Sequence, residues 1–432
     1  MPEPSVARKR FALTLANAVV YARRVRPAPM KHEDAAAAEP VTGRRIAVLG
    51  GCGRVGLPLA LAFAAQGSDV TVVDVDAAAV ARTNRGEMGF RDAGADELLR
   101  AHAGVNLRAT TAPEALAAAD TVICVVGRAS AGSDEGDAFL ALVEALAPHL
   151  RAGQLLVLRS TVPPGTTERL ARWLDARLPG MDLACCPERA VEGHALEELA
   201  RLPQLVAGAT PRAGARARAL FARIAPEVVE LAPLEAEVGK LLCNAWRAVT
   251  FAVANEFHAL CAARGLDYAR LHGAVTRDYP RAQGLPRAGL AGGPCLSRDV
   301  ERLAAFADGD FSLGRAAAAV HRAFPRVLLG QLRPLGLGGK VVGLLGMAFK
   351  AESDDGRDSL AFELARLLAP ECRAVLCTDE HLRAPGLVPL ERVLAEADAL
   401  VVTAPHARYR SLCPRQPVLD PWNALGRGSL LR

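Results

Sequence analysis

A cysteine and an aspartate, four residues apart, are the side chains of this chain that most suggest covalent chemistry. They are Cys295 and Asp299 in the segment GGPCLSRD, residues 292–299. Glycines let a backbone come close to a ligand, and a cysteine beside exposed backbone amides can be stabilised as a thiolate. An aspartate within a turn of that thiol can hold or activate a water. The alternative is a loop with an idle cysteine, because most lone cysteines are small buried hydrophobic residues.

A dinucleotide-binding signature near the start of the chain favours the chemical interpretation. An apolar run at 45–49, the motif GCGRVG at 51–56, a helical run at 57–64 and a second apolar run at 70–73 precede Asp74. In such a unit the first glycine permits a tight turn, the second admits the pyrophosphate and the third lets helix pack on strand. The carboxylate accepts hydrogen bonds from ribose hydroxyls and repels a 2′-phosphate, so the predicted cofactor is NAD. The predicted cofactor contacts in this signature are Gly51, Gly53, Arg54, Val55, Gly56 and Asp74.

The composition indicates a globular protein of two or three domains. The chain has 432 residues and 51% apolar content, enough for sizeable cores. Its net charge of +5 is small and lies largely in the N-terminal tail, so no nucleic-acid partner is predicted. The ten cysteines show neither CxxC nor Cys/His spacing, which indicates no metal site, no disulfide framework and a cytoplasmic location. No apolar run approaches the roughly 18 residues of a membrane span, so no integral membrane segment is predicted.

Residues 1–43 form the segment that differs most from the rest. They combine a basic cluster at 8–10, an apolar run at 11–22, two further arginines and an Ala/Glu/Pro stretch at 34–40. We predict a basic extension followed by a linker. A helix that contacts a membrane surface and a cleaved signal peptide are the alternatives.

Alternating strand and helix patterns predict an α/β fold, with two Rossmann-like doubly wound parallel-sheet domains joined by a helical middle domain. The predicted domains are 44–211, 212–335 and 336–432. Strands are expected at 45–49, 70–74, 121–126, 154–159 and 182–186, and later at 340–345, 374–378, 399–403 and 417–420. Helices are expected at 135–149, 165–177, 234–264 and 358–369, with a Gly/Pro-rich segment at 280–294 in the helical middle.

Polar clusters follow several of these strands. In open α/β sheets ligands bind outside the carboxyl ends of the strands, and residues 160–165, 187–193 and 348–357 are expected there. Lys240 and Asn244 lie four apart on the long middle helix and therefore share a face. Such a pair is usually a solvated stripe, but its neighbours here are nearly all apolar, so it needs a buried partner or a ligand.

From about residue 44 to 423 the chain resembles the UDP-glucose/GDP-mannose dehydrogenase family, the nucleotide-sugar 6-dehydrogenases. The matching motifs are the glycine fingerprint with Asp74, Ser160-Thr161-Val162-Pro163, Pro187-Glu188, Lys240 with Asn244, Gly292-Gly293-Pro294-Cys295-Leu296 with Asp299, Phe349-Lys350 with Asp354-Asp355-Gly356-Arg357, and Thr403-Ala404-Pro405-His406. The resemblance implies oxidation of C6 of a nucleotide-linked hexose from alcohol to carboxylate. Two NAD act in succession without release of the aldehyde, and the product serves surface polysaccharide biosynthesis.

The resemblance also implies catalytic roles. Lys240, or a water that it orders, helps to remove the hydroxyl proton. Cys295 attacks the aldehyde, and Lys240 and Asn244 stabilise the oxyanion of the resulting thiohemiacetal. A second oxidation gives a thioester, which is hydrolysed by a water held by Asp299 and Thr161. Glu188 is then the general base.

Further contacts are implied in the same way. Arg281 resembles an arginine that reaches the substrate across a dimer interface, with a surface arginine as the alternative. The family implies a UDP-binding C-terminal domain and a homodimer or dimer of dimers built on the helical middle. Thr161 and Arg357 are implied as further cofactor contacts. The implied substrate contacts are Glu188, Arg189, Lys240, Asn244, Arg281, Gly293 and Lys350.

The chain departs from the family pattern at four places. Arg54 stands where a tyrosine is usual, and Val126-Gly127-Arg128 replaces a Pro-Thr-Pro loop, which alters one wall of the NAD site. Arg298 replaces a lysine, which keeps the charge but not the geometry. Gly356 replaces a leucine and loosens a turn near the site.

The motifs also bear on the substrate. The segments 187–193 and 293–295 look closer to the UDP-N-acetylhexosamine branch, so we predict a UDP-sugar, with an N-acetylated sugar preferred over UDP-glucose or GDP-mannose. One rival class is a 3-hydroxyacid or 6-phosphogluconate-type dehydrogenase, which lacks the third domain and the cysteine loop. The other is a non-catalytic regulator that binds NAD and a nucleotide sugar, supported only by the altered loop at 126–128.

Overall fold

The computed structural model describes residues 44–126 and 135–432 of the chain. The predicted extension 1–43, and Gly127 and Arg128 of the altered loop, lie outside the described residues. The structural findings below concern the described ranges alone.

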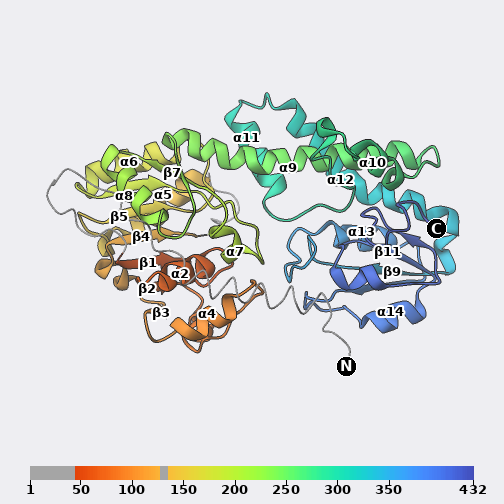
Figure 1. Ribbon diagram of the computed structural model, residues 1–432, viewed down its shortest axis with the longest axis horizontal. Helices are drawn as coiled ribbons and strands as arrows, with labels where there is room; N and C mark the ends of the chain where they lie inside the picture. The colour runs from red at the N-terminus through yellow and green to blue at the C-terminus, as the bar shows by residue number, and fades with distance from the viewer. Residues whose placement is uncertain (1–43, 127–134) are drawn as a thin grey trace. The chain divides into compact units, whose positions relative to one another are not determined.

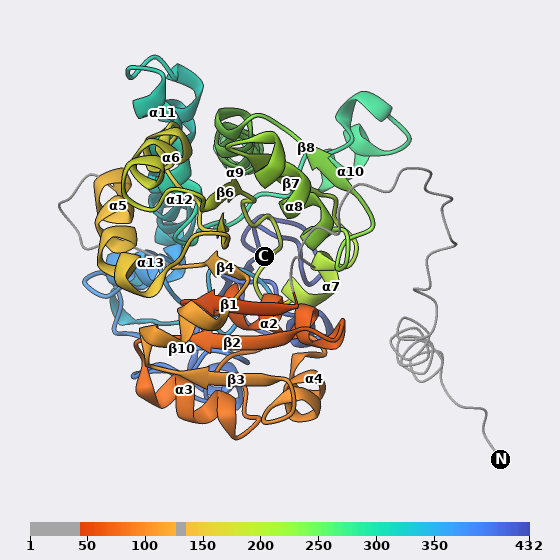
Figure 2. The same ribbon diagram turned by 90° about the vertical axis from the view of Figure 1, so that its left-hand side faces the viewer.

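The first sheet has eight strands in the order β3-β2-β1-β4-β5-β6-β7-β8. Figure 2 shows β3, β2, β1 and β4 lying in this order. Neighbouring strands are parallel except β6 and β7, which are antiparallel, so the prediction of a parallel sheet is correct for all pairs but one. The strands are β1 Arg45–Leu49, β2 Asp69–Val73, β3 Leu107–Thr110, β4 Thr121–Cys124, β5 Leu155–Leu158, β6 Asp182–Cys185, β7 Gln204–Gly208 and β8 Val228–Glu230.

Apolar cores lie on both faces of this sheet. Along β1, Ile46 and Val48 join one core, and Ala47 and Leu49 join the other. This alternation is the period-two geometry of a strand buried on both faces. The covering helices are α2 Gly56–Ala65, α3 Ala77–Asn84, α4 Ala95–His102, α5 Glu135–Leu146, α6 Thr166–Arg177, α7 Ala195–Leu199 and α8 Pro211–Phe221, with 3₁₀ turns η1 Pro113–Ala118 and η2 Ala147–His149.

Three strands of the first sheet were not predicted. β3 and β7 lie between predicted elements, and β8 lies inside the stretch that we predicted to be helical from 212 onward. Helix α8 packs on this sheet, and its Arg216 forms an ion pair of 2.7 Å with Asp182 on β6. The first sheet therefore continues past residue 211, where the helical middle was expected to begin.

The helical middle is built on one long helix. α9 begins at Pro233, where the Glu235 carboxylate accepts a hydrogen bond from the Ala232 amide at 2.7 Å, and it runs to Ala262. α9 packs against α11 and α12, as Figure 1 shows. No helix within 44–126 and 135–432 is long and apolar enough to cross a membrane. The other elements here are α10 Tyr268–Thr276, η3 Pro280–Ala282, α11 Leu296–Phe306, α12 Ser312–Leu332, η4 Arg333–Leu335 and η5 Leu337–Gly339.

The C-terminal part contains a second, four-stranded sheet in the order β10-β9-β11-β12, with all pairs parallel. Each of its strands and its first helix fall within two residues of the predicted bounds. Two Rossmann-like sheets with a helical middle confirm the predicted fold class. The elements are β9 Val341–Leu345, α13 Leu360–Leu368, β10 Ala374–Thr378, α14 Leu390–Glu396, β11 Ala399–Val402, η6 Ala407–Ser411 and β12 Val418–Leu419.

Candidate active site

The glycine fingerprint joins β1 to α2, and the protein's own packing requires two of its three glycines. A Cβ at Gly51 would lie 2.6 Å from the Val48 carbonyl oxygen, and one at Gly56 would lie 2.5 Å from the Cα of Gly51. At Gly53 an added Cβ would meet only the Gly50 carbonyl oxygen, at 3.7 Å. The space beside Gly53 is therefore open to a ligand, as a pyrophosphate site requires.

The start of α2 and Asp74 complete a site that fits a dinucleotide. No described side chain caps α2. In its first turn the Leu57 amide donates to the Gly53 carbonyl oxygen at 3.0 Å and Pro58 has no N–H, so the Gly56 amide is the one left to face an anion. Asp74 follows β2 and accepts hydrogen bonds from the amides of Cys52 (2.9 Å) and Asp76 (3.1 Å), which ties the end of β2 to the glycine loop. Its carboxylate is only partly buried and keeps lone pairs for ribose hydroxyls. These residues fit NAD.

Helix α9 carries Lys240 and Asn244 and is anchored on the loop that precedes α6. The anchor is Glu237, a buried carboxylate that accepts the amides of Gly165 (2.6 Å) and Thr167 (2.7 Å). A carboxylate at the N-terminus of a helix is favourably placed. Lys240 lies one turn further along α9 and is half-buried, while Asn244 is buried.

The segment before Cys295 is fixed at both ends. The Asn255 side chain of α9 exchanges two hydrogen bonds with the Gly289 backbone, of 2.8 and 3.1 Å. Gly293 has a φ of +102°, and a Cβ there would lie 2.7 Å from the Phe349 ring, so both backbone conformation and close contact require glycine. Cys295 then stands at the N-cap position of α11 and is exposed.

The surroundings of Cys295 favour the protonated thiol. Although the residue reaches the surface, burial of the thiol and the charge of Asp299 raise the pKa of Cys295, and Arg298 and Lys240 offset this only in part. The Arg298 Nη2 atom lies 4.0 Å from the Cys295 sulfur. The thiol must therefore lose its proton during the reaction.

Asp299 joins α11 to α9 beside the cysteine. It is 1% exposed, and its two oxygens accept hydrogen bonds from Asn244 Nδ2 at 2.6 Å and Arg302 Nη1 at 2.9 Å. The Asp299 amide donates to the Cys295 carbonyl oxygen at 3.0 Å. Asn244 was expected to need a buried partner, and Asp299 is that partner.

Glu188 is held in a buried ion pair with Arg159, which follows β5. Glu188 Oε2 lies 2.6 Å from Arg159 Nη2, and Oε1 accepts the amides of Arg189 and Ala190 at 2.7 Å each. Burial raises the pKa of Glu188, but Arg159 and these amides together lower it below the usual value. Glu188 is therefore ionised at neutral pH, with both oxygens already hydrogen-bonded.

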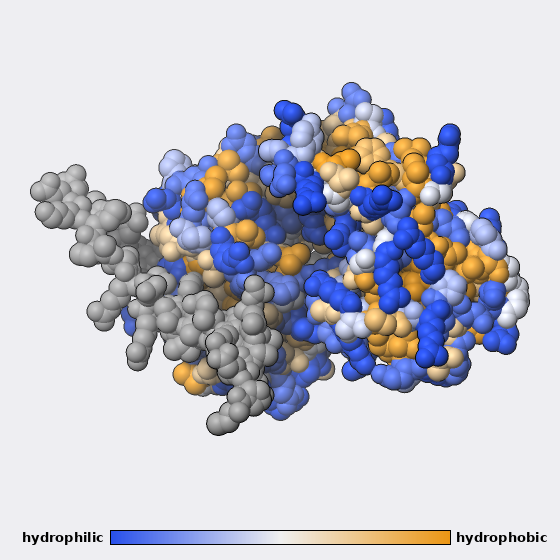
Figure 3. Space-filling view, turned by 45° about the vertical axis from the view of Figure 1, so that its right-hand side comes forward, coloured by the Kyte–Doolittle hydropathy of each residue, from blue (hydrophilic) through white to orange (hydrophobic). Residues whose placement is uncertain are grey.

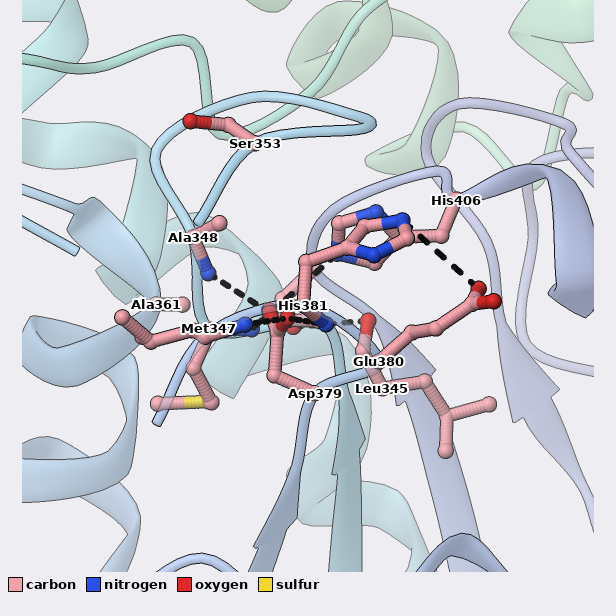
Figure 4. A network of polar contacts seen from close by, with 12 residues as sticks. Leu345, Met347, Ala348, Ser353, Ala361, Asp379, Glu380, His381 and His406 are labelled. Carbon is pink, nitrogen blue, oxygen red and sulfur yellow. Dashed lines mark hydrogen bonds and ion pairs between the residues drawn. The ribbon is translucent and has the colours of Figure 1, made fainter. Parts of the chain in front are cut away.

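The loop from 346 to 359, here called the β9 loop, is held by hydrogen bonds to residues that follow β10 and β11. Asp379, directly after β10, accepts two backbone amides of this loop, at 2.6 and 2.9 Å, and lies 3.1 Å from His406 Nε2 (Figure 4). Nδ1 of His406 accepts the Glu352 amide at 3.0 Å. Burial opposes ionisation of Asp379, but these contacts lower its pKa to about 2. The β9 loop therefore has a fixed shape on the second sheet.

The β9 loop carries Lys350 and Arg357 to the segment 187–193. Lys350 Nζ donates to the carbonyl oxygen of Glu192, and burial lowers the pKa of Lys350. Arg357 pairs with Asp355 and lies 3.5 Å from the Glu192 carboxylate. Burial and Asp355 raise the pKa of Glu192. Two predicted ligand-binding cations thus lie at the junction of the two Rossmann-like parts.

Three predicted site residues lie outside the group formed by α9 and α11, although the Arg189 amide donates to Glu188. Arg281 is exposed, and its Nε donates to the Tyr279 hydroxyl at 2.9 Å. Arg189 donates to the Pro203 carbonyl oxygen, and Thr161 is half-buried in the loop after β5. Among the described residues, none of the three forms a hydrogen bond or ion pair with the catalytic candidates Cys295, Lys240, Asn244 and Asp299.

Two polar side chains that hold the site, Arg159 and Glu237, were not predicted, and neither was the partner of a third, Asp354. Arg159 ends an apolar run, and Glu237 lies one turn before Lys240, so both could have been flagged as buried charges that need partners. Asp354 was noted as part of a motif, but its partner Arg54 lies 300 residues away, and no local pattern indicates that pair.

A glycine fingerprint that fits NAD, two Rossmann-like sheets and a helical middle that presents a cysteine define the class: an NAD-binding dehydrogenase. The sequence matches three domains of one family. Residues 44–225 match the NAD binding domain of the UDP-glucose/GDP-mannose dehydrogenase family, 234–321 its central domain, and 343–427 its UDP binding domain. The chain therefore belongs to the UDP-glucose/GDP-mannose dehydrogenase family, as the motifs indicated, and is an NAD-dependent nucleotide-sugar dehydrogenase.

Relatives with known names agree. An NDP-N-acetyl-D-galactosaminuronic acid dehydrogenase of Ralstonia nicotianae is 31% identical over 85% of this chain and 92% of its own. A UDP-N-acetyl-D-mannosamine dehydrogenase of Yersinia pestis is 31% identical over 86% of this chain and 96% of its own. The solved structure of a UDP-D-ManNAc dehydrogenase from Pyrococcus horikoshii superposes with a TM-score of 0.81, at 27% identity, over 88% of this chain and 96% of that one.

Proposed function

We propose that this enzyme acts in the cytosol and oxidises C6 of a UDP-N-acetylhexosamine to the carboxylate. The product serves the synthesis of a surface polysaccharide. The observation that carries the proposal is the group formed by α9 and α11, in which Cys295 lies beside Asp299, Asn244 and Lys240. The names of the relatives support an N-acetylated sugar. UDP-glucose and GDP-mannose stay as the alternative substrates.

The proposed chemistry begins with removal of the C6 hydroxyl proton, assisted by Lys240. When bound, NAD accepts a hydride from C6 in each of the two oxidations. The Cys295 thiol then gives up its proton to a solvent water as its sulfur adds to the aldehyde carbon, and the carbonyl oxygen becomes an oxyanion. Lys240 and Asn244 stabilise that oxyanion. An asparagine amide has two N–H donors, and Asp299 takes one, so the other is left for the oxyanion.

The second hydride transfer converts the thiohemiacetal into a thioester between Cys295 and C6. Hydrolysis completes the proposed reaction: water adds to the thioester carbon, the C–S bond breaks, the Cys295 sulfur leaves as a thiolate and C6 is released as a carboxylate. Asp299 and Thr161 hold the water, and Glu188 accepts its proton. A general base must be ionised, and the ion pair with Arg159 ensures this for Glu188. The same ion pair makes Glu188 a weak base, because it stabilises the carboxylate that has to take the proton.

The binding residues are proposed by the same reasoning. Arg54 and Arg357, with the glycine fingerprint, hold NAD. Lys350, Arg189 and Gly293 hold the sugar nucleotide. Arg281 is exposed, as a residue that acts on the active site of a second chain would be.

NADH formation at 340 nm tests the proposal. The purified protein is mixed with NAD and, in turn, UDP-GlcNAc, UDP-ManNAc, UDP-GalNAc, UDP-glucose and GDP-mannose. We expect two NADH per sugar with an N-acetylated UDP-sugar, and none from the Cys295→Ala variant. Activity with UDP-glucose or GDP-mannose alone would move the assignment to that substrate. Binding of a UDP-sugar without any NADH would favour the non-catalytic regulator.

A further inference from the structure

We propose that Asp354 is a positioning residue that acts through Arg54 and couples the binding of NAD to the binding of the sugar nucleotide. Arg54 stands in the glycine fingerprint, and Asp354 stands in the β9 loop. The inference rests on the proposed function, because Lys350 of the same loop is there a contact of the sugar nucleotide.

Arg54 and Asp354 form a partly buried ion pair between the two Rossmann-like parts. The guanidinium Nη1 contacts Asp354 Oδ1, and the two side chains are 21% and 22% exposed. The guanidinium also lies 5.3 Å from the centre of the Phe90 ring, and its Nε is 3.9 Å from Asp355. A pair so shielded from water is stronger than an ion pair on the open surface.

Asp354 is held from the other side as well. Its Oδ2 accepts the backbone amide of Arg91 at 3.0 Å, so both oxygens contact the NAD-binding part. The Arg91 side chain reaches Glu352 of the β9 loop at 3.7 Å and lies 2.6 Å from a ring nitrogen of His381. The β9 loop is thus attached to the fingerprint and to its neighbouring segment by several polar contacts.

The same loop touches the opposite wall of the site. Lys350 donates to the Glu192 carbonyl oxygen, and the Asp358 carbonyl oxygen accepts the Gly293 amide at 3.3 Å. Asp379 and His406 fix the shape of this loop on the second sheet (Figure 4), so the loop holds Asp354 and Lys350 in one arrangement relative to each other. A ligand that binds Lys350 therefore stabilises the arrangement in which Asp354 meets Arg54.

The ion pair leaves Arg54 able to bind an anion. A guanidinium has five N–H donors, and the Asp354 carboxylate uses only part of them. With its side chain already held beside the glycine loop, Arg54 loses less conformational freedom when a pyrophosphate arrives. Linkage then requires that each ligand tightens the other by the same factor. A tyrosine at this position is uncharged and would not form this ion pair.

Equilibrium binding tests the inference without turnover. The dissociation constant of NADH is measured by its fluorescence with and without saturating UDP, and that of UDP with and without NADH, by calorimetry. In the wild type we expect UDP to lower the dissociation constant of NADH by about fivefold or more, within the usual range of such couplings. In Asp354→Asn and in Arg54→Gln this ratio of NADH dissociation constants, without and with UDP, should fall below about twofold. The ratio in the double variant should be no smaller than in either single variant.

The ratio of the NADH dissociation constants without and with UDP separates a positioning role of Asp354 from a structural one. If Asp354 only supported the fold, Asp354→Asn would weaken NADH equally with and without UDP and keep the factor. That result, or a wild type that binds NADH and UDP independently of each other, would overturn the coupling while leaving the proposed function intact. A wild type that binds NADH but no UDP would contradict the proposed function and the coupling together. Glu371→Gln, which breaks an exposed ion pair with Arg333, is the matched control and should keep the wild-type factor.

Discussion

The Cys295 thiol lies between charges of opposite sign, and their balance decides when it can react. Asp299 disfavours the thiolate, while Arg298 and Lys240 favour it. Arg298 replaces the lysine that is usual in the family, and an arginine keeps its charge at every accessible pH. With its pKa above the usual thiol value, Cys295 is mostly protonated at neutral pH, and a protonated thiol is a poor nucleophile.

This balance predicts how Cys295 reacts with an alkylating agent. Because its pKa is raised, the thiolate fraction is small at neutral pH and grows as the pH rises toward and beyond the usual thiol value. The rate of inactivation by iodoacetamide should therefore still be increasing at pH 9. Removing the nearest cation in Arg298→Gln should slow the reaction severalfold at pH 8. The measurement uses a Cys413→Ser background, since Cys413 is also exposed. A rate that levels off below pH 8 would contradict the raised pKa.

At the residue scale, local spacing predicted partners only where they lie on one helix face or one motif. Lys240 and Asn244 were expected to share a face and to need a buried partner, and Asp299 meets Asn244 at 2.6 Å. The ion pair of Arg159 with Glu188 and that of Arg54 with Asp354 were not predicted. Each joins the ends of strands or loops that are distant in sequence, so only the assembled fold brings the charges together.

At the scale of elements, the apolar pattern predicted most strands of the sheet interiors. It missed β3 and β8, which are only partly buried, and also β7, which is buried along nearly its whole length. β1, β6 and β9 are buried along nearly their whole length and were found. β8 has three residues, none of them buried, so its sequence differs little from a loop. The antiparallel direction of β7 was also missed, because direction is set by the connection from β6 and not by side-chain alternation.

The fingerprint loop gives a prediction that separates packing from ligand binding. Gly56→Ala would place a Cβ 2.5 Å from Gly51, so α2 cannot keep its position and the protein should express poorly or melt much earlier. Gly53→Ala meets nothing closer than 3.7 Å and should fold with a melting temperature near that of the wild type. Its methyl group occupies the space for the pyrophosphate, so NADH affinity should fall at least tenfold, about 1.4 kcal/mol.

Thermal unfolding and NADH fluorescence measure the two effects on the same proteins. Gly67→Ala is a control for the cost of replacing a glycine, since Gly67 has a φ of +80° with open space around its Cα and lies at the far end of α2. It should be mildly destabilised and bind NADH normally. Equal NADH affinity in Gly53→Ala and the wild type would mean that the open space beside Gly53 is not the cofactor site.

At the scale of the whole molecule, the site depends on contacts among three stretches of chain that carry the fingerprint, the cysteine and the β9 loop. The motif order indicated which residues belong to the site, and the resemblance to a family indicated their roles. How the stretches meet could not be predicted, because it depends on surface shape and on polar pairs such as Lys350 with Glu192. The β9 loop is where these contacts concentrate, so substitutions there should affect both ligands.

The surface of α9 gives the last prediction, which concerns assembly. Leu242, Trp246 and Leu260 are 53%, 66% and 63% exposed, and Phe257 is 44% exposed. Trp246, Phe257 and Leu260 lie 4, 15 and 18 residues after Leu242, close to one, four and five helical turns, so these side chains share one face. Figure 3 shows that hydrophobic residues gather in patches on one face of the molecule, between hydrophilic ones. An apolar face of this kind is typical of a protein interface.

We therefore expect the protein to elute as a dimer in size-exclusion chromatography with light scattering. Trp246→Glu should shift it to the 45.4 kDa single chain, because a buried carboxylate is costly at an interface. Val105 lies between α4 and β3 and is 74% exposed, and Val105→Glu should leave the dimer intact. If Arg281 acts on the partner's site, Trp246→Glu and Arg281→Ala should both raise the KM for the sugar nucleotide severalfold, and combining them should add little. A Trp246→Glu protein that stays dimeric would place the interface elsewhere.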